Sequence, residues 1–217
     1  MQLFATTAAP LGLTGFFPAV LVFFFLGYLF GSIPTGLWLC KMLHHIDIRQ
    51  YGSGNIGATN VFRTVGPKTA ALVLICDMLK GIVPLYVADH ILAGLPLAVA
   101  ITALGALLGH NYSFLLRFRG GKGVATGLGL FLYMLPLSAG VGFLFWIVIV
   151  AVTRYVSLGS VIGALAAAVS AWLLGYPWAY AAFGTLAAIF VIVRHKDNLK
   201  RLANGTESKI KPGHLNK

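Results

Sequence analysis

Long apolar segments alternate with short polar links along the chain. Apolar residues dominate stretches 16–39, 69–89, 96–109, 124–152, 158–174 and 178–193, and Pro136 divides the fourth stretch into two helices joined by a turn at 135–137. A helix needs about 20 apolar residues to cross the hydrocarbon core of a bilayer, and several of these segments are shorter. The pattern predicts an all-α fold: a polytopic membrane helix bundle of seven transmembrane helices, with residues 1–217 forming a single integral-membrane domain.

The composition agrees with a membrane protein. Hydrophobic residues make up 59% of the chain and charged residues only 10%, whereas a soluble domain usually carries about 25% charged residues. A net charge of +11 is also common in nucleic-acid-binding proteins, but here the cations lie in the links between apolar segments. This distribution favours contact with anionic membrane lipid, and we expect no nucleic-acid partner.

The cations also predict an orientation. With seven crossings, the links at 40–68, 111–123 and 153–157 and the tail that begins at Arg194 lie on one side, and they hold every Lys and Arg except Lys80. Cytoplasmic links carry an excess of Lys and Arg. We therefore expect the N-terminus outside, the C-terminus in the cytoplasm, and the polar motifs together on the cytoplasmic face. Within the second apolar segment, Asp77 and Lys80 are three residues apart, which predicts a structural ion pair that supports the cytoplasmic loops.

The link before the fourth apolar stretch is rich in glycine and cations. Gly120, Gly121 and Gly123 allow tight turns and the close approach of a ligand to the backbone, and Lys122 adds a full charge. The apolar run from Val124 predicts a helix whose unpaired N–H groups and dipole suit a phosphate group. This is not a Walker A loop, because a glycine follows the lysine where a Ser or Thr would bind Mg²⁺. A flexible basic turn between membrane helices is the alternative interpretation.

A second polar motif occupies residues 51–63. Ser53, Asn55 and Asn60 can donate hydrogen bonds to phosphate or hydroxyl oxygens, and Arg63 can bind a phosphate through two parallel hydrogen bonds. Taken alone, the motif is more typical of a turn followed by a helix N-cap. Because we expect it on the same membrane face as the glycine-lysine loop, the two motifs together favour one anion pocket.

Further polar residues lie at the ends of apolar segments. His195 and Asn198 share a helix face if the last helix continues past the membrane, although a basic tail that binds anionic lipid has the same composition. His110 is a candidate base, but a lone histidine at a helix end more often serves only as a hydrogen-bond partner. No carboxylate cluster or Cys/His grouping indicates a metal site.

The order of these motifs resembles the bacterial acyl-phosphate:glycerol-3-phosphate acyltransferases, the PlsY family. The resemblance rests on segments that follow one another from about residue 27 to residue 207, namely 31–36 with 53–63, 109–126, 154–158 and 195–207. The two glycine-rich segments are long and specific, whereas the short serine-containing link at 154–158 is weak by itself.

This resemblance implies a seven-helix enzyme of the bacterial inner membrane with its active site on the cytoplasmic side. It would transfer a fatty acyl group from acyl phosphate to the sn-1 hydroxyl of glycerol 3-phosphate, giving lysophosphatidic acid and phosphate, without a cofactor. The expected partners are glycerol 3-phosphate, acyl phosphate and membrane lipid. A soluble enzyme that produces acyl phosphate is a further candidate partner, and the sequence does not show whether it docks here.

The resemblance also implies roles for individual residues. The implied catalytic residues are Ser53, Arg63, Lys122, His195 and Asn198, of which the first three would anchor glycerol 3-phosphate. The implied substrate-binding residues are Asn55, Asn60, His110, Gly120, Gly121, Gly123, Val124 and Ser157, with the amides of 120–124 around the acyl-phosphate group. Val156 or Ser160 would fill the place of a second serine in the short link.

The sequence offers no obvious catalytic base. None of its six histidines is followed five positions later by Asp, the H-x₄-D pairing of other glycerolipid acyltransferases. Acyl phosphate is an activated anhydride, so positioning and charge stabilisation can supply much of the acceleration, and the resemblance implies that the acceptor's own phosphate takes the proton. A small transporter or channel is the competing class, but no internal inverted repeat supports it. A scaffold for lipid enzymes, which would bind without turnover, is the third.

Overall fold

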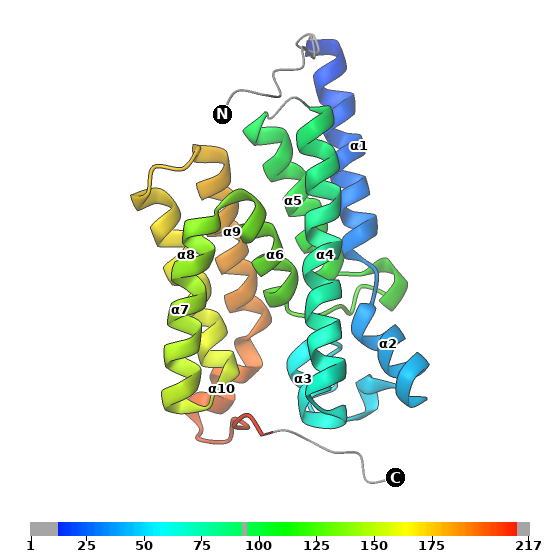
Figure 1. Ribbon diagram of the computed structural model, residues 1–217, viewed down its shortest axis with the longest axis vertical. Coiled ribbons are helices and arrows are strands. Elements are labelled where there is room, and N and C mark those ends of the chain that lie inside the picture. Colours follow the sequence, from blue (N-terminus) through cyan, green and yellow to red (C-terminus); the bar gives the residue numbers. More distant parts are fainter. Residues whose placement is uncertain (1–12, 93–94, 212–217) are drawn as a thin grey trace.

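Every regular element in the described part of the chain, residues 13–92 and 95–211, is a helix in this computed structural model (Figure 1). The helices are α1 (Leu13–Gly31), α2 (Thr35–His44), η1 (Ile48–Gln50), α3 (Ala58–Val65), α4 (Pro67–Ile91), α5 (Pro96–Asn111), η2 (Phe114–Leu116), α6 (Val124–Met134), α7 (Pro136–Thr153), α8 (Val156–Leu173), α9 (Trp178–Arg194) and α10 (Lys196–Ala203). The all-α prediction is confirmed for these residues. Both termini, including the expected external N-terminus, lie outside them.

Helix length and composition support five membrane spans in the described residues, or six if α9 and α10 form one span with a 57° bend. α6 has only 11 residues, which extend about 16 Å along its axis, roughly half of the ~30 Å hydrocarbon core. Figure 1 shows this helix beside the middle of α4. Every expected apolar stretch is helical, with two helices in the first and two in the fourth, but seven crossings remain a prediction.

The first apolar stretch, 16–39, which was expected to supply one crossing, contains two helices. Helix α1 ends at Gly31 and α2 begins at Thr35. Pro34 causes this interruption, because proline has no N–H group and disfavours helical backbone at the residue before it, Ile33. Pro18, in contrast, lies inside α1 without ending it.

The expected ion pair on α4 is confirmed, and it supports the break between α1 and α2. Asp77 Oδ1 lies 2.7 Å from Lys80 Nζ, and both side chains are buried. Lys80 Nζ also donates to the carbonyl of Ile33 at 2.8 Å, and Thr35 Oγ1 donates to Asp77 Oδ1. Lys80 thus gives the Ile33 carbonyl a second hydrogen bond, besides the one from the Thr35 amide at 3.0 Å, and stabilises the break.

Small residues let several helices approach closely. A Cβ atom at Gly105 or Gly109 would collide with carbonyl oxygens of α1, and one at Gly142 would lie 2.7 Å from the carbonyl oxygen of Gly163. Packing of this kind is typical of helices in membranes, where small side chains replace the hydrophobic effect as the basis of association. It joins α1 to α5 and α7 to α8. In Figure 1, α1, α4 and α5 lie on one side, α7, α8 and α9 lie on the other, and α6 lies between them.

Candidate active site

The two glycine-containing motifs and the C-terminal segment meet at one large cavity of about 1090 Å³. Its polar part is lined by residues of the 52–63 segment, the 118–125 segment and the 193–208 segment, and by residues of α8. Its apolar part is formed by α6, α7, α8 and α9, with many Gly and Ala residues in the wall: Gly127, Ala139, Gly142, Gly163, Ala164, Ala167, Ala187 and Ala188. A cationic mouth thus continues into an apolar space.

The loop at residues 51–57 is shaped by the side chain of Asn60. This side chain is buried, accepts a hydrogen bond from the Ser53 amide at 2.9 Å, and donates to the carbonyls of Tyr51 and Asn55 at 3.0 and 2.8 Å. Gly52 has a φ of +57°, which other residues rarely adopt. The polar atoms of Asn60 are therefore used within the loop, and they hold Ser53 and Asn55 at the cavity.

Arg63 follows this loop on α3. Its Nη2 atom donates to the carbonyl of Ser208 at 2.7 Å, but its Nε atom is buried and has no hydrogen-bond partner in the described structure. Burial lowers the pKa of Arg63, yet guanidinium remains charged at any physiological pH. A half-buried cation with an unused donor at a cavity wall is suited to an anionic ligand.

The glycine-lysine loop is fitted tightly against the end of α5. The Gly121 amide donates to the carbonyl of His110 at 2.9 Å, and the Gly120 amide donates to that of Asn111 at 3.2 Å. A Cβ atom at Gly121 would collide with the ring of His110. The loop therefore requires glycine for space, and it directs the following backbone towards α6.

α6 begins at Val124 with a free N-terminus. Gly123, its N-cap, has a φ of +79° and offers no side chain to the first N–H groups. These amides and the helix dipole face the cavity, because Gly123, Val124 and Ala125 all line it. Uncapped helix amides beside a cation form an arrangement that binds phosphate groups.

Arg194, at the end of α9, stabilises the same loop from the other side. Its Nε and Nη2 atoms donate to the carbonyls of Gly121 and Gly120 at 3.0 and 2.9 Å. Its guanidinium also lies over the ring of Tyr112, 5.5 Å from the centroid. This arginine therefore fixes the two carbonyl oxygens of the loop, whose Gly120 and Gly121 amides are already bound by the carbonyls of Asn111 and His110. The expectation that the amides of 120–124 surround a phosphate is thus wrong for Gly120 and Gly121, and it stays a prediction for the amides that follow them.

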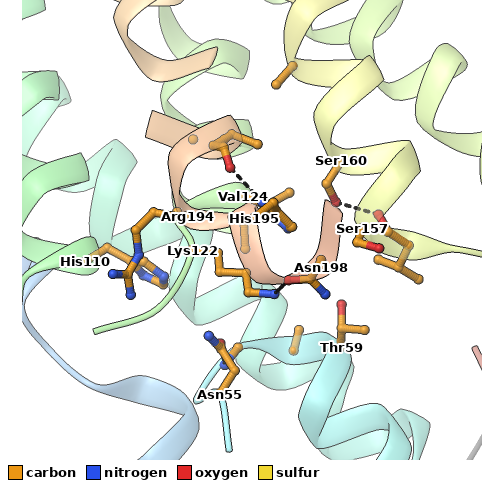
Figure 2. A pocket seen from close by; sticks show the side chains of 18 of the residues that line it. Asn55, Thr59, His110, Lys122, Val124, Ser157, Ser160, Arg194, His195 and Asn198 are labelled. Atoms are coloured by element: carbon orange, nitrogen blue, oxygen red, sulfur yellow. Dashed lines mark hydrogen bonds between the residues drawn. The ribbon is translucent and has the colours of Figure 1, made fainter. Parts of the chain in front are cut away.

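Lys122 lies near the centre of the cavity and contacts Asn198 of α10 (Figure 2). Its Nζ donates to Asn198 Oδ1 at 2.5 Å, and Asn198 Nδ2 donates to Glu207 Oε1 at 2.7 Å. Burial lowers the pKa of Lys122 to about 8; Glu207 opposes this, and the neighbouring arginines add to it. The amine is still mainly protonated at neutral pH, and an arriving anion would favour its charged form further.

Glu207 joins three segments of the site. Its Oε1 also accepts from Ser157 Oγ of α8 at 2.8 Å, and its Oε2 accepts from Arg201 Nε at 2.8 Å. Burial raises the pKa of Glu207, but the hydrogen bonds from Asn198, Ser157 and Arg201 outweigh this and lower it overall. Glu207 is therefore ionised at neutral pH.

His195 occupies the bend between α9 and α10. Its Nδ1 lies 2.8 Å from the carbonyl of Val191, so Nδ1 must carry the proton and Nε2 is left as an acceptor. Burial lowers the pKa of His195 to about 4, and the charge of Lys122 contributes. The ring is therefore neutral at pH 7 and a weak base.

The comparisons with known proteins agree with one another. The family model described as glycerol-3-phosphate acyltransferase matches residues 21–205. A glycerol-3-phosphate acyltransferase of Syntrophomonas wolfei is 43% identical over 183 residues, which cover 84% of this chain and 93% of that protein. One from Rippkaea orientalis is 45% identical over 195 residues, covering 85% of this chain and 90% of the relative. The chain belongs to the glycerol-3-phosphate acyltransferase family.

Solved structures of a relative extend the likeness to the fold. The crystal structure of PlsY, an integral membrane glycerol 3-phosphate acyltransferase, in its glycerol 3-phosphate form has a TM-score of 0.84 and 36% identity, covering 89% of this chain and 96% of that one. Its lysophosphatidic acid form has a TM-score of 0.83 at the same identity and coverage. The chain is thus an integral-membrane glycerol-3-phosphate acyltransferase with a PlsY-like helical fold.

This acyltransferase brings nearly all of the predicted site residues to one cavity. Those that line it are Ser53, Asn55, Asn60, Arg63, His110, Gly120, Lys122, Gly123, Val124, Ser157, His195 and Asn198. Gly121 does not line it, because its carbonyl is bound by Arg194 and its Cα packs against His110. Val156 and Ser160 both line it, and the Ser160 hydroxyl donates to the Val156 carbonyl at 2.8 Å. The roles of these residues remain predictions.

The sequence interpretation did not assign three residues of the acyltransferase site: Arg194, Arg201 and Glu207. The two arginines look like ordinary members of a basic tail. Glu207 is one of only five acids in the chain, but Asp197 lies in the same basic segment, so the sequence does not show which of the two has a buried partner.

Proposed function

We propose that this acyltransferase uses acyl phosphate as its donor and acylates the sn-1 hydroxyl of glycerol 3-phosphate, giving lysophosphatidic acid and phosphate. The observation that carries the proposal is the single cavity with a cationic, glycine-lined mouth and an apolar interior. Both substrates carry a phosphate group, and one carries a long acyl tail. The name of the PlsY relative supports the acceptor, since that protein was solved in a glycerol 3-phosphate form.

We assign the acceptor's phosphate to Arg63, Lys122 and the 53–60 loop. Arg63 Nε is an unpaired buried donor, and Lys122 is a largely buried cation whose present partner is a neutral amide. An incoming dianion would replace weak partners with strong ones, because hydrogen bonds to charged groups are roughly twice as strong as neutral ones. Ser53 and Asn55 lie on the same loop and would add neutral donors.

We assign the donor's phosphate to the amides at the start of α6. These amides have no side-chain cap, and the apolar space begins one helical turn further on, where Gly127 and Leu128 line the cavity. A donor whose phosphate binds there can place its tail in that space. Ser157, His195 and Asn198 would complete the polar wall around the reacting carbonyl.

In the proposed reaction the hydroxyl oxygen of the acceptor forms a bond with the acyl carbon. The bond between that carbon and the phosphate oxygen breaks, and the phosphate leaves with its electron pair. The hydroxyl proton goes to the acceptor's own phosphate group. A phosphate monoester has a second pKa of about 6, so it is a stronger base than His195, whose pKa is about 4. Arg63 and Lys122 then act as positioning and electrostatic groups, not as base or nucleophile.

The location of the reaction is part of the proposal. We propose seven crossings of the bacterial inner membrane, an external N-terminus and a cytoplasmic active site and C-terminus. Support comes from the cations, because all of them except Lys80 lie in four regions on one side of a seven-crossing topology. A soluble enzyme that produces acyl phosphate would then deliver its product at the face where the cavity opens.

The test uses protein purified in detergent and supplied with glycerol 3-phosphate and hexadecanoyl phosphate. We expect equimolar release of inorganic phosphate and formation of 1-acyl lysophosphatidic acid, identified by mass spectrometry. The matched reaction replaces hexadecanoyl phosphate with hexadecanoyl-CoA, which should give no product. Binding of glycerol 3-phosphate without turnover would favour a scaffold, and uptake of it into vesicles without acylation would favour a transporter.

A further inference from the structure

Gly127 is a buried glycine whose missing side chain faces empty space. A Cβ atom built there would meet no heavy atom within 4 Å, although the residue itself is buried and lines the cavity. Its neighbour Gly129 is different, because a Cβ atom at that position would collide with the backbone of Met78. Packing between helices therefore explains Gly129 but does not explain Gly127.

The backbone conformation does not explain Gly127 either. It lies inside α6, and it is absent from the glycines that adopt a positive φ. A glycine inside a helix costs about 1 kcal/mol relative to alanine. The residue thus weakens its helix, and what it provides is room in the cavity.

That room lies on the path from the phosphate site to the apolar space. Val124, Gly127 and Phe131 are three or four residues apart and line the cavity from one side of α6. Gly127 is about 4.5 Å beyond Val124 along the helix axis, so it would lie beside the first carbons of an acyl chain whose phosphate binds the α6 amides. Phe131 packs against Phe183 and Gly184 of α9, and Ala187 and Ala188 of α9 also line the cavity.

We infer that Gly127 sets the width of the passage by which the acyl chain leaves the phosphate site, and so determines which acyl donors the enzyme accepts. This inference rests on the proposed acyl-phosphate reaction and names the residue that selects the donor's tail. A larger side chain at 127 would obstruct long acyl chains, would leave the shortest donors less affected, and would not reach the glycerol 3-phosphate anchors on α3 and at Lys122.

The chain provides a matched control in Gly140. This glycine also lies inside a helix, α7, and a Cβ atom there would likewise meet nothing within 4 Å. It is exposed and does not line the cavity. Substitutions at 127 and 140 therefore change helix propensity and side-chain volume in the same way, and only those at 127 alter the cavity.

The experiment measures kcat/KM for butanoyl, octanoyl and hexadecanoyl phosphate, and KM for glycerol 3-phosphate, in Gly127→Ala, Gly127→Val and Gly127→Leu and in the same three variants at Gly140. We expect the ratio of kcat/KM for hexadecanoyl to butanoyl phosphate to fall with side-chain size at 127, by about tenfold or more for valine, because overpacking an apolar site commonly has an effect of that order. KM for glycerol 3-phosphate and all Gly140 variants should stay near the unsubstituted values.

Three results would overturn the inference: an unchanged donor ratio, a rise in KM for glycerol 3-phosphate as the main effect, or the same loss in the Gly140 series. The alanine variant keeps the test open if valine or leucine prevents folding, because alanine adds one methyl group into empty space and raises helix propensity. If the unsubstituted protein acylates with none of the donors, the proposed function fails, and the inference falls with it. If the unsubstituted protein does acylate, and the ratio of kcat/KM for hexadecanoyl to butanoyl phosphate is unchanged in the Gly127 variants, the inference is refuted and the proposed function still holds.

Discussion

Replacing Glu207 with glutamine tests whether one buried carboxylate holds the C-terminal segment over the site. Glutamine keeps the shape, and its carbonyl oxygen can still accept from Ser157 and Asn198. It loses the negative charge, and its NH₂ group would face Arg201, which can only donate. The variant thus removes charge from three hydrogen bonds while it leaves the packing almost unchanged.

The expected loss can be worked from these contacts. Hydrogen bonds to a charged group contribute about 1 kcal/mol more than neutral ones, and two of the three bonds involve buried partners, Ser157 and Asn198. The side chain of Arg201 is 43% exposed, so screening limits that pair to about 1 kcal/mol or less. The sum is about 2–3 kcal/mol, or roughly a 30- to 150-fold rise in the population with the segment open.

Hydrogen exchange of the peptide that covers 205–211 is the direct assay. The Ile210 amide donates to the Arg154 carbonyl at 2.8 Å, so its exchange reports the opening of this segment. We expect exchange of this amide to be faster by the same 30- to 150-fold in Glu207→Gln. Turnover should also be lower, because the charged acceptor that orients Asn198 towards Lys122 is replaced with a weaker, neutral one.

Asp197→Asn is the matched control. Asp197 is an exposed acid on the same helix as Asn198, so its substitution removes the same charge without touching the buried network. Its exchange should match that of the unsubstituted protein. Equal protection of Ile210 in Glu207→Gln and the unsubstituted protein would refute the reasoning, and equal loss in both variants would show a general charge effect instead.

Four further predictions follow from the site. Arg63→Ala and Lys122→Ala should each abolish most acyl transfer by purified enzyme without lowering the melting temperature appreciably; near-normal turnover in either would contradict their assignment. Lys122 loses its charge as the pH rises through its pKa of about 8, so kcat/KM for glycerol 3-phosphate should fall about tenfold per pH unit above that value. Lys122→Arg should move this fall beyond pH ~10, because arginine stays protonated there. An unchanged pH profile in that variant would exclude Lys122 as the titrating group. Asn60→Asp replaces the NH₂ group that donates to backbone carbonyls with an oxygen that can only accept, so it should destabilise the protein by about 3 kcal/mol or more in thermal unfolding. Unchanged stability would mean that the 51–57 loop does not depend on this amide. Asp77→Asn should cost about 3–5 kcal/mol by leaving Lys80 unpaired, and adding Lys80→Met should recover part of it; a double variant no more stable than the single one would contradict the pairing.

Much of the fold follows from patterns that are local in the sequence. Apolar stretches bounded by Gly and Pro predict the helices well, because a bilayer leaves few alternatives for an apolar segment of this length. The break at Pro34 is harder to predict, because part of its stabilisation comes from a distant residue. Lys80 donates to the Ile33 carbonyl from 47 residues away, and no local pattern reveals this contact.

The candidate site was predictable where a motif has a chemical signature of its own. Gly120–Gly123 and Ser53–Arg63 have one, and the structure brings both segments to the same cavity. Glu207 has none, because its function as a junction depends on Ser157, Asn198 and Arg201 meeting in three dimensions. Gly127 is similar: a sequence cannot distinguish a glycine that allows close packing, such as Gly129, from one that leaves a space.

The balance of charge at the cavity argues for two phosphorylated ligands at once. Seven cations line it, Arg49, Arg63, Arg119, Lys122, Arg194, Lys196 and Arg201, against three acids, Asp77, Asp197 and Glu207. Arg49 is paired with Asp47, Arg194 donates to two carbonyl oxygens, and Arg201 is paired with Glu207. The lining still has more cations than acids, and an excess of positive charge favours anionic ligands. In the proposed reaction the acceptor's phosphate binds to cations, whereas the donor's phosphate also relies on uncapped amides, which are neutral and would hold the leaving group less strongly. Such a difference would retain the acceptor during the reaction and allow the released phosphate to depart.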